Sequence, residues 1–257
     1  MRPESALALI RHNLLLARRD LQTFAFAVAM PFVLIAFTRA AYRPVLVGEG
    51  YADANGTEQA VPGMAVMFAL LLVGTIGFRI FEEHSWGTWS RLRASPAGPL
   101  TVLAGKLLPS LLVVGAQQTV LFVAGVALYD LHVKGSAASV ALVTTALGIC
   151  VLTFGSLLAA FASNANQLNV FANLGGAALA GLGGALVPLS TLPGWARAVA
   201  PATPSYWAMR GFRSVILDGD GIGDVVAPVV ALLAFAAVFA LIAAVRFRFD
   251  EVKSSFL

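Results

Sequence analysis

The stretch of sequence that decides the fold lies between Lys134 and Arg197 and contains no Asp, Glu, Lys or Arg. Its residues 135–196 read GSAASVALVTTALGICVLTFGSLLAAFASNANQLNVFANLGGAALAGLGGALVPLSTLPGWA. A helix needs about 20 apolar residues to cross a hydrocarbon core of ~30 Å, so this stretch is long enough for two crossings. The polar run from Ser163 to Gln167 separates them. The pattern therefore predicts two membrane-spanning helices, at residues 138–162 and 168–192.

Four further apolar stretches predict the remaining spans, at residues 21–41, 60–80, 106–129 and 225–246. The composition agrees with this pattern, because 59% of the residues are hydrophobic and only 12% are charged. A soluble domain carries roughly 25% charged residues, which cover its water-facing surface. We therefore expect an all-α, polytopic membrane protein with six transmembrane helices, in which residues 1–257 form a single transmembrane domain.

Lysine and arginine are unevenly divided between the two sides that six spans define. Eleven of the 17 lie on the side of both termini, and the other side holds six. The eleven are Arg2, Arg11, Arg18, Arg19, Arg79, Arg91, Arg93, Lys106, Arg246, Arg248 and Lys253. Because cytoplasmic segments are enriched in Lys and Arg, we expect both termini in the cytoplasm. The pI near 9.6 is thus a topology signal, and the scattered charges form no patch for nucleic acid.

The N-terminal segment 1–20 is predicted to form an amphipathic helix ahead of the first span. Its apolar residues follow helical spacing and include Leu7, Ile10 and Leu14, whereas Arg11, Arg18 and Arg19 lie off this stripe. Such a helix lies along a membrane interface with its arginines near the lipid headgroups.

The segment 193–224 is predicted to form short re-entrant or interfacial helices on the outer side, before the last span. Pro201 and Pro204 interrupt it, and its helical pieces are too short to cross a bilayer. Trp195, Tyr206 and Trp207 are expected at headgroup depth, where tryptophan and tyrosine are enriched.

No catalytic or metal-binding constellation stands out in the sequence. The residues around Lys106 lack the spacing of a phosphate loop, and Val229 stands where a calcium loop starting at Asp218 needs its glutamate. The predicted span interiors also lack the ionisable side chains that ion-coupled carriers usually hold at membrane depth. We expect no enzymatic activity and no metal. If the chain moves a solute uphill, we expect the energy to come from another chain.

The polar side chains inside the predicted spans are Gln117 and Gln118 in the third, and Asn169 and Asn173 in the fifth. They would either form hydrogen bonds between helices or line a substrate path. The fifth span is also rich in glycine and alanine from Gly175 to Gly184. Small residues let helix backbones approach closely in lipid, which predicts close packing within the chain, with a dimer seam or a flexing helix as alternatives.

The loop after the second span carries the most specific motif. From Phe81 it reads FEEHSWGTWSRLRASP, and Gly105-Lys106-Leu107 opens the third span. This resembles the signature of ABC exporter permeases of the second type, the class of drug, antibiotic and polysaccharide exporters that includes the daunorubicin-resistance-like permeases. His84 stands where that signature has Arg or Lys, and Ser85 where it has a second glutamate. The segment from Leu192-Pro193-Gly194-Trp195 to Leu217-Asp218-Gly219 is similar to the outer segment of the same family.

The resemblance implies a multi-pass permease of the bacterial cytoplasmic membrane that exports a small lipophilic, drug- or antibiotic-like compound. It implies a second permease copy, identical or paralogous, and separate ATPase subunits that hold ATP and Mg²⁺, so that this chain needs no cofactor of its own. Residues 82–99 would be the coupling loop on the ATPase, and residues 1–20, with Arg11, Arg18 and Arg19, the connecting helix. The residues implied in coupling are Glu82, Glu83, Trp86, Gly87, Thr88, Arg91, Arg93 and Pro96.

Other functions are open at this point. The same mechanism could export a polysaccharide or a lipid-linked substrate. An ion-coupled secondary carrier is a rival that the charge-free spans disfavour. A membrane enzyme would need clustered catalytic groups, and a membrane anchor without transport activity would need no special residues at all.

Overall fold

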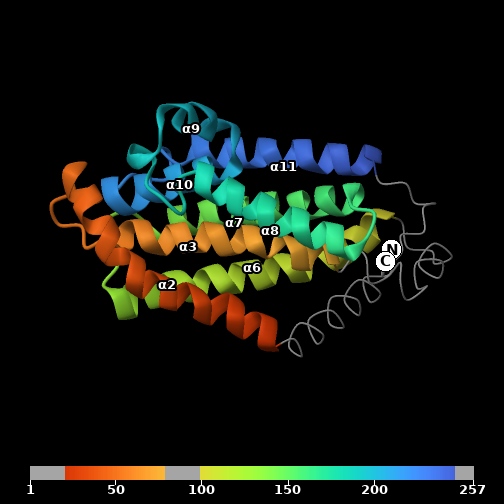
Figure 1. Ribbon diagram of the computed structural model, residues 1–257, viewed down its shortest axis with the longest axis horizontal. Coiled ribbons are helices and arrows are strands. Elements are labelled where there is room, and N and C mark those ends of the chain that lie inside the picture. The colour runs from red at the N-terminus through yellow and green to blue at the C-terminus, as the bar shows by residue number, and fades with distance from the viewer. Residues whose placement is uncertain (1–20, 79–98, 247–257) are drawn as a thin grey trace.

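The computed structural model describes residues 21–78 and 99–246, and it describes side chains for residues 29–78 and 109–246. The described chain contains helices and no strand, which confirms the all-α class (Figure 1). The long helices are α2 (Leu21–Gly48), α3 (Thr57–Leu71), α6 (Pro99–Tyr129), α7 (Ala137–Phe161), α8 (Ala165–Leu182) and α11 (Val226–Arg246). The short helices α9 (Gly194–Val199) and α10 (Pro204–Arg213) lie between α8 and α11, as the sequence predicted for this segment.

Within the described part of the chain, five helices are long and apolar enough to cross a membrane: Ala29–Gly48, Thr57–Phe78, Pro109–Tyr129, Ala137–Phe161 and Val226–Arg246. They correspond to five of the six predicted spans. The remaining predicted span, at residues 168–192, corresponds to α8. Its predicted end is wrong because α8 stops at Leu182. Gly184 has a left-handed φ of +84°, a conformation that ends a helix and that glycine adopts without steric cost. At 18 residues, α8 is about 27 Å long.

The polar run between the fourth and fifth predicted spans does separate two helices. Asn164 is the N-cap of α8, and its side chain accepts a hydrogen bond from the backbone N–H of Gln167 at 2.8 Å. Gln167 in turn accepts from the backbone N–H of Ser163 at 2.7 Å. This reciprocal arrangement resembles a capping box and satisfies N–H groups that a helix start leaves open.

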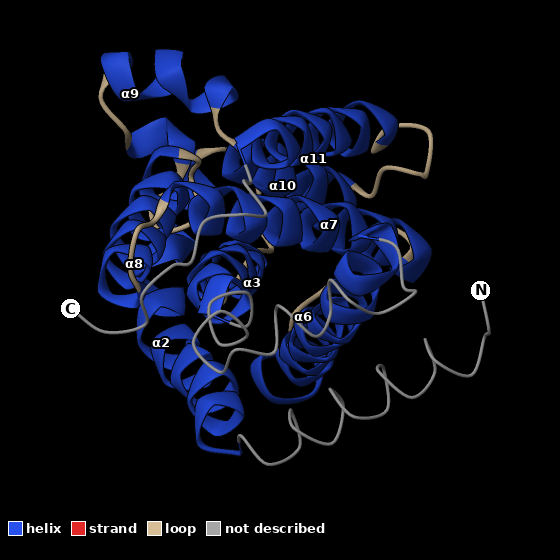
Figure 2. Cartoon of the chain, turned by 90° about the vertical axis from the view of Figure 1, so that its right-hand side faces the viewer, coloured by secondary structure: helices blue, strands red, loops and turns tan. Residues whose placement is uncertain are grey.

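Helix α3 is the axis of the bundle. Of the most apolar 18 residues of the membrane-length helix Thr57–Phe78, 78% are buried, against 22% for the corresponding residues of α2 and of α11. Helices α2, α6, α7, α8 and α10 all pack on α3, whereas α11 packs on α7 and α10 at the edge (Figure 2). Large apolar side chains such as Phe37, Leu128 and Val245 are exposed on the outer helices, as expected for surfaces in contact with lipid.

Small residues set the distance between α3 and α8. The buried row of α8 is Leu168, Ala172, Gly176 and Ala180, spaced by four residues. A Cβ atom on Gly176 would lie 3.1 Å from the carbonyl oxygen of Leu70, and one on Gly74 would lie 3.3 Å from the Cβ of Ala172. This confirms the prediction of close packing within the chain, because lipid supplies no hydrophobic drive between helices and close contact must hold them together.

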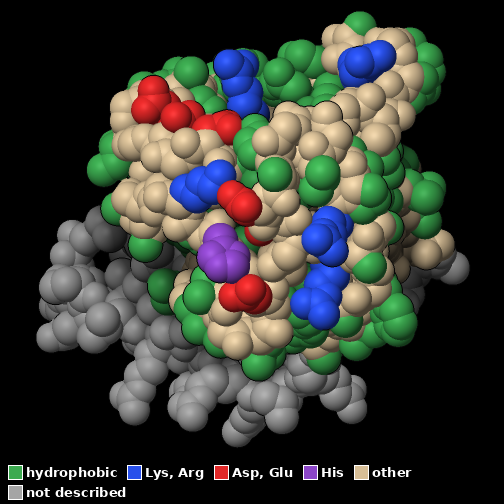
Figure 3. Space-filling view, turned by 90° about the vertical axis from the view of Figure 1, so that its left-hand side faces the viewer, with side chains coloured by type: hydrophobic (Ala, Val, Ile, Leu, Met, Phe, Trp, Pro, Cys, Tyr) green, Lys and Arg blue, Asp and Glu red, His purple; other side chains and the backbone are tan. Residues whose placement is uncertain are grey.

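The charged side chains gather at one end of the bundle. Between residues 29 and 246, every described charged side chain except that of Arg246 belongs to the last ten residues of α2 or to the segments 49–58, 130–134 and 197–224. We call the end of the bundle formed by residues 49–56, 130–136 and 214–225 the loop end, and Figure 3 shows its mixed acidic and basic surface. The charge-free helices beyond it match a bilayer interior, where an ionised group is costly.

A polar network joins four segments at the loop end. Arg213, at the end of α10, forms an ion pair with Glu49, which follows α2, and donates a hydrogen bond from Nη1 to Oε1 of Gln59 in α3 at 3.2 Å. Gln59 is fully buried, and its Nε2 donates to the carbonyl oxygen of Gly184 at 2.8 Å. The network therefore ties α2, α3, α10 and the segment after α8 to one another.

Glu49 makes this network sensitive to pH. Burial raises the pKa of the Glu49 carboxyl group, but hydrogen bonds from Ser190 and Arg213 and the charge of Arg213 outweigh burial and lower that pKa below its ordinary value of 4.5. Because the folded pKa is depressed, the ionised carboxylate stabilises the fold above about pH 4.5, and this contribution is lost as the pH falls through the folded pKa.

Replacing Gly63 by alanine should destabilise the bundle. The added Cβ would overlap the backbone carbonyl oxygen of Ala185, and overpacking of this kind typically costs about 1–3 kcal/mol. Gly175→Ala is the matched control, since nothing lies within 4 Å of a Cβ placed there. Thermal unfolding in detergent, followed by tryptophan fluorescence, should show a lower midpoint for Gly63→Ala only. Equal midpoints for the two variants would contradict the packing described above.

Glu49→Gln should reduce stability at pH 7 by up to about 1 kcal/mol, the upper range for a partly exposed ion pair. The difference from the natural protein should shrink as the pH falls well below 4.5, because the natural carboxyl group is then neutral as well. Asp53→Asn, at an exposed acid with no described partner, serves as the control. A stability difference that stays constant from pH 7 to pH 3 would show that the ion pair is not its origin.

Candidate functional site

The outward face of α8 carries polar side chains in an otherwise apolar helix. Asn169 and Asn173 are both exposed on this face, one helical turn apart. Nδ2 of Asn173 donates to Oδ1 of Asn169 at 2.6 Å and to the carbonyl oxygen of Asn169 at 2.9 Å. The described hydrogen bonds of the chain do not use Nδ2 of Asn169 or Oδ1 of Asn173. An amide group without a partner in hydrocarbon costs several kcal/mol, so this face needs a partner other than lipid tails.

Other exposed polar side chains on the long helices pose no such problem. The hydroxyl of Thr119 donates to the carbonyl oxygen of Gly115, and that of Thr145 to the carbonyl oxygen of Ala141, each at 2.8 Å. A threonine satisfied by its own helix presents mainly its methyl group to lipid. The two asparagines of α8 therefore differ from these threonines, because an amide has more hydrogen-bonding positions than its neighbour can fill.

The exposed face of α8 continues onto α2. Figure 2 places the two helices on the same side of α3. The hydroxyl of Tyr42 in α2 donates to the carbonyl oxygen of Leu186, just after α8, which holds the two at the loop end. Around the asparagines this face offers small side chains, at Ala177 and Ala178, and a large apolar one at Leu174. It can therefore accept a closely packed helix or a mainly apolar molecule with a few polar groups.

Gln117 and Gln118 lie elsewhere, buried at the contact of α6 with the rest of the bundle. Both are fully buried, and Nε2 of Gln118 donates to the carbonyl oxygen of Ala65 in α3 at 2.8 Å. The structure thus brings Asn169 and Asn173 together but separates them from the two glutamines. A buried amide bonded to a neighbouring helix backbone holds two helices together, which is one of the two roles expected from the sequence.

The residues implied in ATPase coupling lie outside the described part of the chain. These are Glu82, Glu83, Trp86, Gly87, Thr88, Arg91, Arg93 and Pro96, together with Arg11, Arg18 and Arg19 of the N-terminal segment. The described helix ends that flank the 79–98 segment, at Phe78 and Pro99, both lie at the end of the bundle opposite the loop end.

Three acidic residues of the loop end accept hydrogen bonds from other groups of the loop end. Asp218 accepts from the hydroxyl of Tyr51 at 2.7 Å, Asp220 from Ser214 at 2.6 Å, and Asp224 from the backbone N–H of Gly221 at 3.2 Å. Within residues 21–78 and 99–246, no three His, Cys, Asp or Glu residues are grouped to hold a metal ion.

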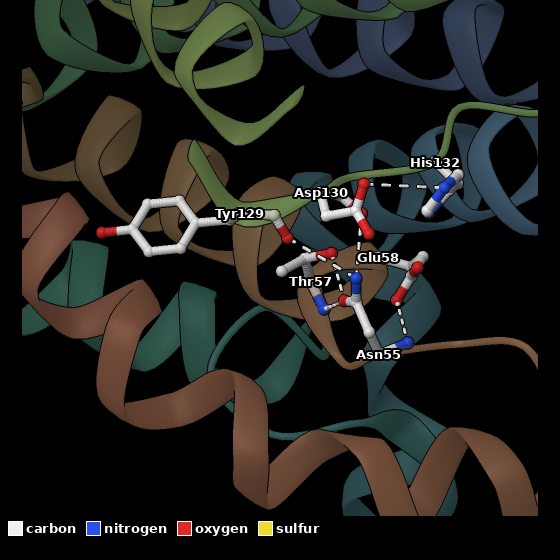
Figure 4. Close-up of polar contacts among 6 residues, drawn as sticks. All are labelled: Asn55, Thr57, Glu58, Tyr129, Asp130 and His132. Carbon is white, nitrogen blue, oxygen red and sulfur yellow. Dashed lines mark hydrogen bonds and ion pairs between the residues drawn. The ribbon is translucent and has the colours of Figure 1, made fainter. Parts of the chain in front are cut away.

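Acidic and amide side chains also organise the start of α3 (Figure 4). Oε2 of Glu58 accepts from the backbone N–H groups of Asn55 and Gly56, at 3.2 and 3.0 Å. Nδ2 of Asn55 donates to the carbonyl oxygen of Asp130 at 2.8 Å, which links this turn to the end of α6. A carboxylate at a helix start also interacts favourably with the helix dipole. Glu58 is therefore buried without a cationic partner because backbone N–H groups surround it.

Sequence reasoning missed the network of Glu49, Gln59 and Arg213. Glu49 and Arg213 are 164 positions apart, and no local spacing pairs them. The available signal was the position of Gln59 at the start of an apolar span, next to Glu58.

Comparison with known proteins places these features in a family. The profile of the ABC-2 type transporter family matches residues 4–217. The linearmycin resistance permease protein LnrN of Bacillus subtilis (strain 168) is 27% identical over 187 residues, which are 73% of this chain and 48% of that protein. The probable multidrug ABC transporter permease YbhR of Escherichia coli (strain K12) is 27% identical over 138 residues, 52% of this chain and 37% of that protein. The matched region thus spans less than half the length of either relative. Because the family profile covers most of the sequence, this multi-pass membrane protein belongs to the ABC-2 type transporter family of permeases.

Proposed function

We propose that this chain is the membrane subunit of an ATP-driven exporter that moves a small lipophilic, drug- or antibiotic-like compound out of the cell. Membership of the ABC-2 family is the observation that carries the proposal. The chain would work with separate ATPase subunits, which bind ATP and Mg²⁺, and with a second permease copy. The relatives named for linearmycin resistance and multidrug transport support the substrate class.

The proposed topology has six spans, with α8 as the fifth. Its length of about 27 Å is close to the hydrocarbon thickness, and it packs along the buried axis α3. Both termini and the 79–98 segment would lie in the cytoplasm, and the loop end would face outward. The division of Lys and Arg, eleven against six, supports this orientation.

The proposed substrate path runs along the outward face of α8, at the seam with the second copy. Asn169 and Asn173 would meet either the partner helix or the passing compound, which removes the cost of exposing amides to lipid. The apolar and small residues beside them suit a lipophilic substrate that makes few hydrogen bonds. The charge-free helices offer no ion-coupling group, which leaves ATP as the source of energy.

Glu83→Ala should uncouple ATP hydrolysis from export. In the proposed role, Glu83 transmits movement of the ATPase to the permease, so its loss should leave a complex that hydrolyses ATP but exports poorly, by at least about tenfold (1.4 kcal/mol). The measurement uses the complex purified from native membranes, with the co-purifying ATPase identified by mass spectrometry. ATP turnover and the drug susceptibility of the cells are then compared.

Asp53→Ala is the control for this experiment, since Asp53 is an exposed acid at the opposite, loop end. It should leave both activities unchanged. Normal export by Glu83→Ala would refute the coupling role, and the absence of any co-purifying ATPase would refute the proposed function as a whole.

A crosslinker placed on the outward face of α8 should capture a permease chain. Cys150 is the only cysteine and is buried, so Asn173→Cys introduces the one accessible thiol of the described part of the chain. A photoreactive maleimide attached there should yield a crosslinked dimer, either with a second copy or with a paralogue, identified by mass spectrometry.

Leu241→Cys is the matched position, on the exposed side of α11, where we expect attachment to lipid alone. Capture of a permease chain from position 241 and not from position 173 would place the seam on α11 instead of α8. This result would contradict the proposed substrate path.

A further inference from the structure

The segment that contains α9 and α10 presents two unpaired cations. From Pro188 to Leu217 the sequence contains Arg197, Arg210 and Arg213 and no acidic residue. Arg213 is engaged by Glu49 and Gln59. Arg197 and Arg210 are exposed, and within the described part of the chain neither forms an ion pair. Two guanidinium groups on this surface are therefore free to bind an anion.

Aromatic side chains hold one of these cations in place. The guanidinium carbon of Arg210 lies 5.5 Å from the ring centroid of Trp207, within the range of a cation–π contact. Nε1 of Trp207 donates to the carbonyl oxygen of Pro201 at 2.9 Å, and the ring of Tyr206 meets it edge-on with centroids 5.3 Å apart. The ring of Trp207, itself held by a hydrogen bond, thus holds the guanidinium group of Arg210, and the Arg210 side chain is exposed.

Helix α9 presents an apolar surface next to this charge. It stands away from the long helices at the edge of the bundle, in the half toward the loop end (Figures 1 and 2). It buries Ala196 and exposes Trp195, with 67% of its surface accessible, and Val199, with 47%. Arginine beside exposed tryptophan and an aliphatic residue is typical of a helix that lies in the headgroup region of a bilayer.

We infer that the α9–α10 surface binds anionic phospholipids of the leaflet at the loop end, with a lipid phosphate at Arg210, a lipid phosphate at Arg197, and acyl chains against α9. A guanidinium group matches a phosphate in geometry and binds it through paired hydrogen bonds. The exposed Trp195 and Val199 favour a lipid over free phosphate as the ligand, because only a lipid has acyl chains that can pack against these two side chains. This lipid site goes beyond the export function and does not depend on the ATPase.

Native mass spectrometry of the full chain in a mild detergent tests the inference. Phosphatidylglycerol and phosphatidylcholine with the same acyl chains are added in equal amounts, and the bound lipid is counted. The natural protein should retain phosphatidylglycerol preferentially. Arg210→Gln and Arg197→Gln should each weaken that binding by about fivefold, the scale for one basic residue at an anionic membrane surface. Arg210→Lys, which keeps the charge but loses the planar group on Trp207, should lie between Arg210→Gln and the natural protein.

Arg43→Gln is the matched control, because Arg43 is an exposed cation near the loop end on α2 with no described partner. It should retain the lipid preference of the natural protein. Equal loss in this control, or no loss in Arg210→Gln, would overturn the inference. Displacement of the lipid by millimolar glycerol phosphate would also overturn it, in favour of a site for soluble phosphate. Unchanged thermal midpoints identify variants that remain folded, and ATP-driven export is not part of the readout.

Discussion

A polar group inside a bilayer has no water to bond with, and the rest of this structure follows from that constraint. Apart from Arg246, the described charged side chains lie in the half of the bundle toward the loop end, and the rest of the long helices is free of them. Several buried or half-buried polar side chains donate to backbone carbonyl oxygens of neighbouring helices. Gln118 reaches Ala65, Tyr129 reaches Phe32, and Ser205 reaches Leu179. Each of these bonds satisfies a costly group and also fixes the position of one helix against another.

Without water, the hydrophobic effect no longer brings helices together. Close packing between helices stabilises the bundle instead. Helix α3 is largely buried because five helices pack on it, and Gly176 of α8 lets the backbones of α3 and α8 approach closely. The network around Arg213 then joins the loop ends of the helices that surround this axis. These contacts tie the long helices to the central helix and to one another.

The three surfaces that bear on function lie on different parts of this scaffold. The segment implied in ATPase coupling connects helix ends opposite the loop end. The asparagine face of α8 lies along the length of the bundle, on the side shared with α2. The α9–α10 surface stands at the edge, toward the loop end. The proposed exporter subunit would need separate contacts with an ATPase, a substrate and the bilayer, and the three proposed surfaces lie apart from one another.

The sequence by itself determined the features that depend on local composition. The apolar runs predicted the helices, the Ser163–Gln167 run predicted the break before α8, and the family motifs predicted the permease class, because each depends on residues close together in the chain. It placed the end of α8 ten residues too far, since the turn at Gly184 depends on backbone conformation. Only the tertiary structure decided which helix is the axis, which polar side chains face outward and which are buried, and that Arg213 joins Glu49. Hydrophobicity requires that these segments enter the membrane, but the direction each face takes depends on how distant helices pack.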